Sequence, residues 1–384
     1  MIVSRRALVA GLATLPLAPS ARLFAQATPR IGEAPITVRD NKLWIPVRFG
    51  QRGPFDFTID TGAGSNIISL DLAHSLGLRE LRQQLIAGIG GTRQAVVYEG
   101  HDVAFGNVDI GTVTFRAPTG DTGPFRAGGA LSASMLTVAD SDLDFEAGRW
   151  RIYPDGRPER TGFAPLPADI RRDQQWGAQI FVNAEIDGAT YRLQLDTGAP
   201  AGIFLYPRAA ARSGLWVDTS PYVPGRARGI GGPGPRTRLV RARHAGLGEI
   251  GFERPLVQLA EPRAANLLEG DGLFGLGLLR RLNLTSEVRA NRLWAKRNAL
   301  PTPPERYGMS GLWVDEIAGR LEITSVSPHS PAAEAGLQAG DIIEGVSLQQ
   351  FVRAITGAPG DAVAIAYRRG GAAQRTTLTL RPYL

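Results

Sequence analysis

The sequence contains no cysteine, only two lysines and four histidines among its 384 residues. Without cysteine the chain can form neither a disulfide nor a thiolate metal site. The histidines are dispersed, with no pair at helical i, i+4 spacing, so the pattern gives no support for a bound metal or other cofactor. A G-x-S-x-G nucleophile elbow is also missing, which removes the usual serine hydrolase candidate.

Almost all of the basic residues are arginine, and the formal net charge is +7. Residues 1–27 contain three arginines and no acidic residue, so their removal lowers the net charge to +4. The other arginines are scattered along the chain, with only short pairs. Solvated surface is therefore the better interpretation of the arginines, and no nucleic-acid partner is predicted.

The first 27 residues have the pattern of a bacterial twin-arginine signal peptide. Arg5-Arg6 precedes an apolar stretch that Pro16 and Pro19 interrupt, and Ala25-Gln26-Ala27 provides an A-x-A cleavage site. The stretch is too short and too broken for a bilayer anchor, although a disordered tail or an uncleaved anchor is the less favoured alternative. We expect a periplasmic or secreted protein, exported already folded, with no stable membrane span after processing.

The motif Asp-Thr-Gly-Ala occurs twice, at residues 60–63 and 196–199. Each copy closes a stretch of alternating apolar residues, 55–59 or 191–195, which is typical of a β-strand. A third Asp-Thr-Gly at residues 121–123 has no strand pattern before it and lies among glycine and proline, so we interpret it as a turn. The preceding strand therefore distinguishes the first two copies from a chance tripeptide.

Two similar units thus offer two carboxylates, those of Asp60 and Asp196. Two facing carboxyl groups that share one proton can activate a water molecule to attack a peptide carbonyl. Carboxyl groups about 3 Å apart cannot both ionise readily, so we expect one pKa to fall and the other to rise, and a bell-shaped activity profile on the acid side. The apolar neighbours that would widen this separation are Phe57, Ile59, Leu193 and Leu195.

The two units repeat further features in the same order. A glycine-rich strip follows each aspartate, and such a strip is typical of a mobile hairpin tip that lets backbone approach a ligand. The strips are Gly88-Ile89-Gly90-Gly91 and Gly229-Ile230-Gly231-Gly232. Residues 142–153 and 284–294 have the pattern of hairpins that end a domain half. The second strip also satisfies G-x-G-x-x-G, but the prolines around it leave no helix to follow, so no dinucleotide site is predicted.

In this order of motifs, residues from about 33 to 300 resemble the pepsin and retropepsin clan of aspartic proteases. The resemblance implies a mostly β fold in which two similar six-to-seven-stranded β-barrel lobes form a pseudo-twofold cleft. It also implies that Asp60 and Asp196 are the catalytic pair and that the two glycine strips are flaps over the substrate. The residues that it assigns to support of the active-site loops are Thr61, Gly62, Thr197 and Gly198.

The resemblance extends to a segment that supports each active-site loop. In the second unit Leu273-Phe274-Gly275 is similar to the family's apolar-apolar-Gly segment. In the first unit the equivalent is Ala130-Leu131-Ser132, with serine where the family has glycine. The two units therefore differ at this point, and the support of the first loop must differ as well.

A third unit follows a stiff proline-rich linker and does not share the repeat. Residues 330–343 resemble the PDZ domains of bacterial proteases: Ser330 can cap a short helix that Gly336 ends. The resemblance implies that Gly311, Leu312 and Trp313 form the loop that holds a peptide's terminal carboxylate, with the peptide added as a strand. A packing or docking role is the alternative. The helix expected to wall the groove contains Leu348, Phe351, Val352 and Ile355.

The predicted segments are a signal peptide (1–27), a first lobe (28–160), a second lobe (161–300), a linker (301–306) and a PDZ domain (307–384). The predicted function is that of an aspartic endopeptidase acting on peptide or protein substrates, with a possible peptide ligand at the PDZ groove. We expect a monomer because the aspartate pair is complete within one chain. A non-catalytic peptide-binding or adaptor protein remains the alternative, although retention of two costly carboxylates argues against it.

Overall fold

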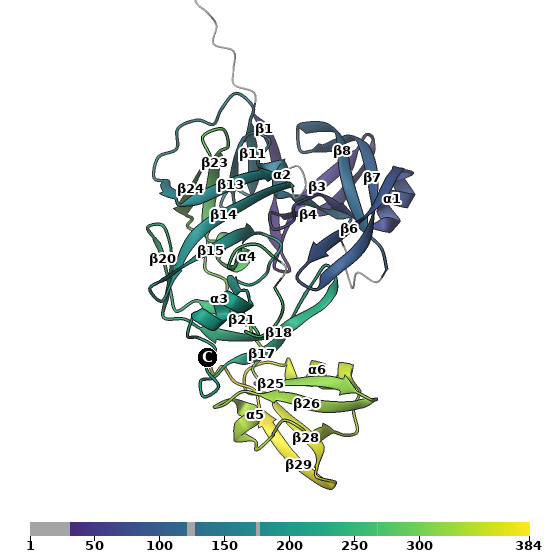
Figure 1. Ribbon diagram of the computed structural model, residues 1–384, viewed down its shortest axis with the longest axis vertical. Helices are drawn as coiled ribbons and strands as arrows, with labels where there is room; N and C mark the ends of the chain where they lie inside the picture. Colours follow the sequence, from purple (N-terminus) through teal and green to yellow (C-terminus); the bar gives the residue numbers. More distant parts are fainter. Residues whose placement is uncertain (1–30, 121–126, 174–176, 267) are drawn as a thin grey trace, which may run out of the picture.

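The computed structural model describes residues 31–120, 127–173, 177–266 and 268–384. The predicted signal peptide and the third Asp-Thr-Gly therefore lie outside the described residues. The described chain is mostly β-sheet and forms two lobes with a smaller C-terminal unit below them (Figure 1), which confirms the predicted fold class. No helix in the described part of the chain has the length and apolar character that a membrane crossing needs.

The first lobe is built on an eight-stranded sheet with the strand order β2-β3-β4-β9-β5-β8-β7-β6. Its strands are β2 (Thr37–Arg39), β3 (Lys42–Phe49), β4 (Arg52–Asp60), β5 (Ile67–Ile68), β6 (Arg79–Gly88), β7 (Gly91–Phe105), β8 (Val108–Pro118) and β9 (Gly129–Ser132), and its helices are α1 (Leu70–Leu76) and α2 (Ala133–Leu136). Alternate side chains of β3 enter the core, where Leu43, Ile45 and Val47 are fully buried. Helix α1 begins at Ser69, whose hydroxyl accepts a hydrogen bond from Leu72 N.

The second lobe repeats this arrangement in a ten-stranded sheet. Its strands are β13 (Ala168–Asp173), β14 (Gly177–Ile186), β15 (Ala189–Asp196), β16 (Ile203–Leu205), β17 (Val223–Gly229), β18 (Gly232–Arg241), β19 (His244–Leu247), β20 (Ile250–Glu253), β21 (Leu256–Ala260) and β22 (Gly272–Gly275), and its helices are α3 (Pro207–Arg212) and α4 (Leu276–Leu279). The order β15-β22-β16-β21-β18-β17 corresponds to β4-β9-β5-β8-β7-β6 of the first lobe. Both sheets exceed the expected six to seven strands because each continues through further hairpins beyond these six.

A six-stranded sheet joins the lobes, with the order β1-β11-β10-β23-β24-β12. Its strands are β1 (Gly32–Pro35), β10 (Asp140–Asp144), β11 (Arg149–Tyr153), β12 (Ala164–Leu166), β23 (Leu282–Glu287) and β24 (Arg292–Arg297). The two predicted domain-ending hairpins are confirmed, as β10 with β11 and β23 with β24. They also pair with each other, with Ser141 opposite Ser286. This sheet ties the lobes into one unit with a continuous apolar core.

The C-terminal unit has its own core and a five-stranded sheet with the order β25-β26-β27-β28-β29. Its elements are β25 (Leu312–Ile317), β26 (Arg320–Val326), α5 (Pro331–Glu334), β27 (Ile342–Ile343), α6 (Leu348–Ile355), β28 (Ala362–Arg369) and β29 (Ala372–Thr379). Ser330 caps α5 as predicted, since its hydroxyl accepts a hydrogen bond from Ala333 N at 3.3 Å. On α6, Phe351 and Ile355 face the core, whereas Val352 is 43% exposed.

Candidate active site

Asp60 and Asp196 end the two corresponding strands β4 and β15 and lie together on the floor of the cleft between the lobes. Their carboxyl groups are joined by a side-chain hydrogen bond. Each carboxyl group also accepts two backbone N–H bonds from its own loop, both at 3.1 Å for Asp60 and at 2.8 and 3.0 Å for Asp196. The structure therefore brings the predicted pair into direct contact.

Gly62 and Gly198 each lie against the carboxyl group of the opposite lobe. A Cβ at Gly62 would lie 2.4 Å from Cγ of Asp196, and a Cβ at Gly198 would lie 2.5 Å from Cγ of Asp60. Non-bonded carbon atoms need about 3.5–4.0 Å. Glycine is thus required at positions 62 and 198 because any larger residue would separate the two carboxyl groups.

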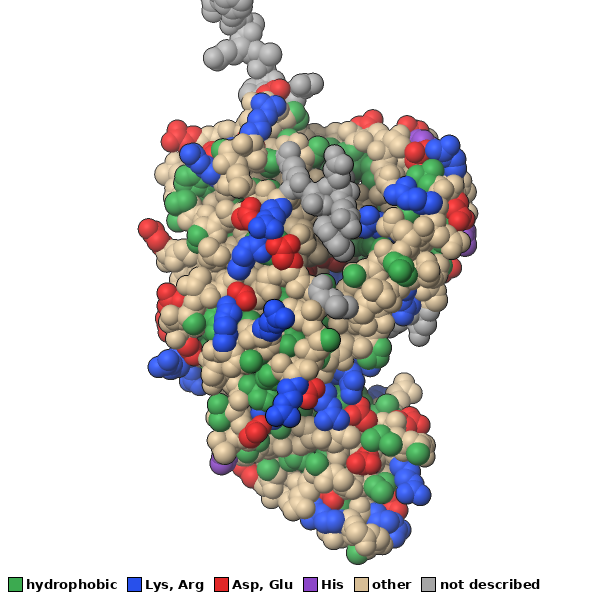
Figure 2. Space-filling view, viewed as in Figure 1, with side chains coloured by type: hydrophobic (Ala, Val, Ile, Leu, Met, Phe, Trp, Pro, Cys, Tyr) green, Lys and Arg blue, Asp and Glu red, His purple; other side chains and the backbone are tan. Residues whose placement is uncertain are grey.

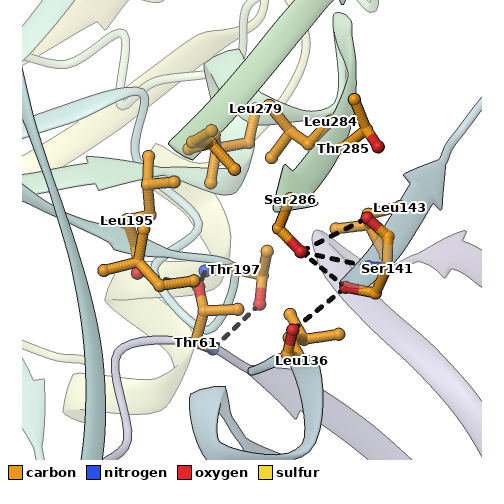
Figure 3. A pocket seen from close by; sticks show the side chains of 12 residues that line it. Thr61, Leu136, Ser141, Leu143, Leu195, Thr197, Leu279, Leu284, Thr285 and Ser286 are labelled. Carbon is orange, nitrogen blue, oxygen red and sulfur yellow. Dashed lines mark hydrogen bonds between the residues drawn. The ribbon is translucent and has the colours of Figure 1, made fainter. Parts of the chain in front are cut away.

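Thr61 and Thr197 connect the two loops by four hydrogen bonds, and Figure 3 shows the one from Thr61 N to Thr197 Oγ1. Thr61 N donates to Thr197 Oγ1 at 3.1 Å, and Thr197 N donates to Thr61 Oγ1 at 3.0 Å. The two hydroxyls donate to the carbonyls of Leu195 and Ile59, at 2.7 and 2.6 Å. Both threonines are buried, with 3% and 1% exposure. The structure thus makes the loop-to-loop contacts that the sequence assigned to these threonines, and they fix the distance between the aspartates.

The apolar floor beneath the loops determines how the two carboxyl groups ionise. Phe57, Ile59 and Leu195 are almost completely buried there. A small cavity of about 30 Å³ near the loops is lined by six leucines and one isoleucine together with serine and threonine side chains (Figure 3). Burial raises the pKa of Asp60, and burial together with repulsion from Asp60 raises the pKa of Asp196 well above its usual value. The expectation that one pKa falls is therefore wrong, because burial outweighs the hydrogen bonds that favour the carboxylate.

Ser132 stands where the second lobe has Gly275, and Asn66 explains how serine is accommodated. Ser132 lies opposite Asp60 in the β4–β9 pairing, as Gly275 lies opposite Asp196 in β15–β22. Asn66 Oδ1 accepts hydrogen bonds from Ser132 N at 2.9 Å and from Ser132 Oγ at 3.1 Å. In the second lobe, the carbonyl of Gly202 accepts the corresponding bond from Gly275 N at 2.8 Å. An asparagine side chain thus replaces a backbone carbonyl.

Replacing Asn66 by alanine should destabilise the protein by about 1–3 kcal/mol, because the buried Ser132 N–H loses its acceptor, whereas the Ser132 hydroxyl keeps its contact with Ser134 Oγ. Chemical unfolding of the parent and the variant measures this difference. Ser65→Ala, one residue earlier in the same loop, is the matched control and should change stability by less. Equal stability of the parent and Asn66→Ala would contradict the support assigned to this contact.

The two glycine strips form the tips of the β6–β7 and β17–β18 hairpins, and these tips touch each other. Gly90 N donates to the carbonyl of Ile230 at 3.0 Å. A Cβ at Gly229 would lie 2.5 Å from Cγ2 of Ile89, and one at Gly88 would lie 2.7 Å from Cβ of Ile230. Each isoleucine thus packs on a glycine of the other strip. Both hairpins, rather than one, extend over the cleft.

The cleft below the hairpin tips has a volume of about 960 Å³ and is lined by both aspartates and by residues of both lobes. Such a volume lies in the range of ligand-binding clefts. Elsewhere the basic side chains are interspersed with acidic ones on the visible surface (Figure 2), so that face carries no continuous basic patch.

Of the residues predicted to form the carboxylate loop of the C-terminal unit, only Gly311 precedes β25, whereas Leu312 and Trp313 are the first two residues of that strand, at the edge of the sheet. Gly311 has a φ of +76°, and a Cβ there would lie 2.1 Å from Cβ of Ser330, so glycine is required. Leu312 is buried, and its N–H donates to Ser310 Oγ at 3.4 Å. The Trp313 indole N–H donates to Asp315 at 3.0 Å. Among the described residues, β25 is hydrogen-bonded only to β26, so its other edge has no strand paired to it, although β17 of the second lobe contacts β25.

The C-terminal unit docks on the base of the β17–β18 hairpin (Figure 1). Tyr222 N donates to Ser327 Oγ at 2.8 Å, and Tyr383 Oη donates to the Tyr222 carbonyl at 2.9 Å. Arg226, which lines the cleft, lies 3.8 Å from Asp315 of β25. The unit thus contacts the same hairpin that extends over the aspartates.

Several cleft residues were not singled out from the sequence. They are Ser65, Arg116, Gln194 and Tyr206, and the buried Asn66 beneath the first loop was not singled out either. Gln194 Nε2 donates to the Gly62 carbonyl at 3.1 Å and so braces the first loop from the second lobe. Burial raises the pKa of Tyr206, which keeps its phenol protonated near Asp196. The alternation of apolar and polar residues in 191–195 predicts that Gln194 lies on the polar face of the strand. No feature of the sequence indicates that the partner of Gln194 is the Gly62 carbonyl of the other lobe.

Two β lobes of matching topology, each giving one aspartate to a shared cleft, define an aspartic protease fold. A family model described as aspartyl protease matches residues 45–133 and 182–278, one region in each lobe. A PDZ domain model matches residues 322–369. The two lobes belong to the aspartyl protease family, and the C-terminal unit is a PDZ domain. No curated protein matches the chain.

Proposed function

We propose that the protein is an aspartic endopeptidase in which Asp60 and Asp196 activate a water molecule. The observation that carries the proposal is the hydrogen-bonded pair of carboxyl groups on the floor of the cleft. Because burial and repulsion from Asp60 together raise the pKa of Asp196, we assign the shared proton to Asp196 and the negative charge to Asp60. Two different roles thus arise from two chemically identical side chains.

In the proposed reaction, the Asp60 carboxylate takes a proton from water as the water oxygen attacks the peptide carbonyl carbon. Asp196 gives its proton to the carbonyl oxygen, so a neutral tetrahedral diol forms. Asp60 then gives the proton to the leaving nitrogen, Asp196 regains one from the diol, and the C–N bond breaks. The threonine cross-link contributes by keeping both carboxyl groups in place throughout.

The substrate is proposed to be an extended peptide or protein segment beneath both hairpin tips. The unpaired edge of β25 supports a second proposed contact, in which the PDZ domain holds a peptide ligand or partner. We further propose a monomeric protein exported through a twin-arginine signal, on the basis of the complete intramolecular pair and the N-terminal sequence.

Digestion of a diverse peptide mixture by the purified protein, read by mass spectrometry from acid to neutral pH, tests the peptidase. New termini that disappear with Asp60→Asn and Asp196→Asn support it. Unchanged peptides, together with peptide capture that depends on the PDZ domain, would favour the non-catalytic binding protein instead.

A further inference from the structure

Arg116 is a cation inside the cleft with no acidic partner among the described residues. It lies on β8 and is partly buried. Its Nη1 donates to Ser65 Oγ at 2.8 Å, and its backbone N donates to the Asn66 carbonyl at 2.9 Å. Both partners belong to the loop that carries Asp60. The guanidinium is therefore held at a fixed place beside the catalytic loop of the first lobe.

A second arginine adds to the positive charge at this place. Arg82 of β6 and Arg116 of β8 both lie opposite Val97 of the intervening strand β7, so their side chains share one face of the sheet. Burial and repulsion from Arg82 lower the pKa of Arg116, although a guanidinium remains charged. Arg82 is exposed, so the cost of desolvation falls on the partly buried Arg116, and a carboxylate beside Arg116 would relieve it.

The second lobe has no such group at the corresponding place. Ala201 and Gly202 occupy the loop positions of Ser65 and Asn66, and the strand β21 offers the neutral Gln258, whose Nε2 donates to Thr237 Oγ1 at 3.1 Å. Of the other charged groups of the cleft, Arg226 lies 3.8 Å from Asp315, and Glu269 lies 2.6 Å from Arg171. Arg228 of β17 also lines the cleft, but it is exposed. Among the described residues, a partly buried arginine held against the catalytic loop is thus a feature of the first lobe alone.

We propose that Arg116, anchored by Ser65 and assisted by Arg82, is a subsite that selects substrates with an acidic side chain. The inference rests on the proposed peptidase function and names the class of its substrate. Ser65 uses only one of the five N–H donors of the guanidinium, so the others can bind a carboxylate in the bidentate manner typical of arginine. Because Ser65 follows Asp60 by five residues, the acidic residue lies a few positions from the scissile bond, on the side held by the first lobe.

Pairs of peptides that differ only by Glu or Gln at one position, scanned along a cleaved sequence, test the subsite. At one position the parent protein should prefer Glu by about tenfold or more in kcat/KM. Arg116→Gln should remove this preference, so that its kcat/KM values for the Glu and Gln peptides lie within about twofold of each other. Arg116→Lys should keep part of it, and Arg116→Glu should favour Lys at the same position. Arg228→Gln, which removes a cleft arginine of the opposite hairpin, is the matched control and should keep the preference for Glu.

Binding of the same peptide pairs to the Asp196→Asn protein, measured by fluorescence anisotropy, separates the subsite from the chemistry. The subsite is supported if the protein binds the Glu peptide more tightly than the Gln peptide and Arg116→Gln removes this difference. If that result is obtained and the parent protein cleaves no peptide, only the peptidase proposal fails. Cleavage or binding without a Glu preference at any position overturns the subsite alone, as does a preference that survives Arg116→Gln. If no peptide is cleaved and none is bound, both the subsite proposal and the peptidase proposal are overturned.

Discussion

Replacing Asp196 by asparagine should lower kcat/KM for a cleaved peptide by about 10²–10⁴-fold or more, and Asp60→Asn should have an effect of the same size. An amide cannot transfer the shared proton, and it cannot act as the base that takes a proton from water. Both variants keep the shape of the side chain, so the hydrogen bonds from the loop can form with the amide oxygen. Steady-state kinetics on one peptide, with circular dichroism to check the fold, measures the effect.

The stability of the Asp196→Asn protein relative to the parent is a control for correct folding, and the direction of the expected change can be derived from the pKa of Asp196. Because the folded pKa of Asp196 is raised, its contribution to stability is complete below the unfolded value near 3.8 and is lost as the pH rises through the folded pKa. The asparagine variant has no proton to lose there and should be at least as stable as the parent at neutral pH. If Asp196→Asn is both inactive and unfolded, its loss of activity says nothing about proton transfer. The activity of a folded Asp60→Asn protein then tests the proton-transfer role.

Gly198→Ala should abolish most of the activity, by at least about 10²-fold, although it changes no catalytic group. The added Cβ would lie 2.5 Å from Cγ of Asp60, so one carboxyl group must move by an ångström or more. Displacements of this size have such effects on positioned groups. Kinetics on the same peptide measures the loss.

Gly246→Ala is the matched control for this substitution. Gly246 also belongs to the second lobe, but a Cβ there would first meet Cε1 of His244 at 3.6 Å, which is an ordinary contact. This variant should retain nearly full activity. Full activity of Gly198→Ala would contradict the close approach of the two loops.

The features that could be predicted from the sequence are those that each lobe builds from neighbouring residues. The alternating strands before Asp60 and Asp196, the glycine strips and the two hairpins all have local signals. Their order, repeated twice, indicated the two lobes and the shared cleft. The cap of α5 at Ser330 is local in the same sense.

The features that could not be predicted depend on contacts between distant segments. Asn66 supports Ser132 across 66 residues, so serine in place of glycine gave no hint of its own partner. The pairing of the two domain-ending hairpins, in which Ser141 lies opposite Ser286, likewise joins segments that are far apart in the sequence. Arg116 resembled every other arginine of an arginine-rich chain until the fold placed it beside Ser65. Composition and spacing carry no information on such pairs.

The pH dependence of kcat/KM for one cleaved peptide tests the central claim, a pair of aspartates that share one proton, most directly. We predict a bell-shaped profile whose acid limb follows protonation of Asp60 and whose alkaline limb follows loss of the Asp196 proton. Because burial raises both pKa values, both limbs should lie above the range of an exposed aspartate. A profile that is flat from acid to alkaline pH would contradict the shared proton.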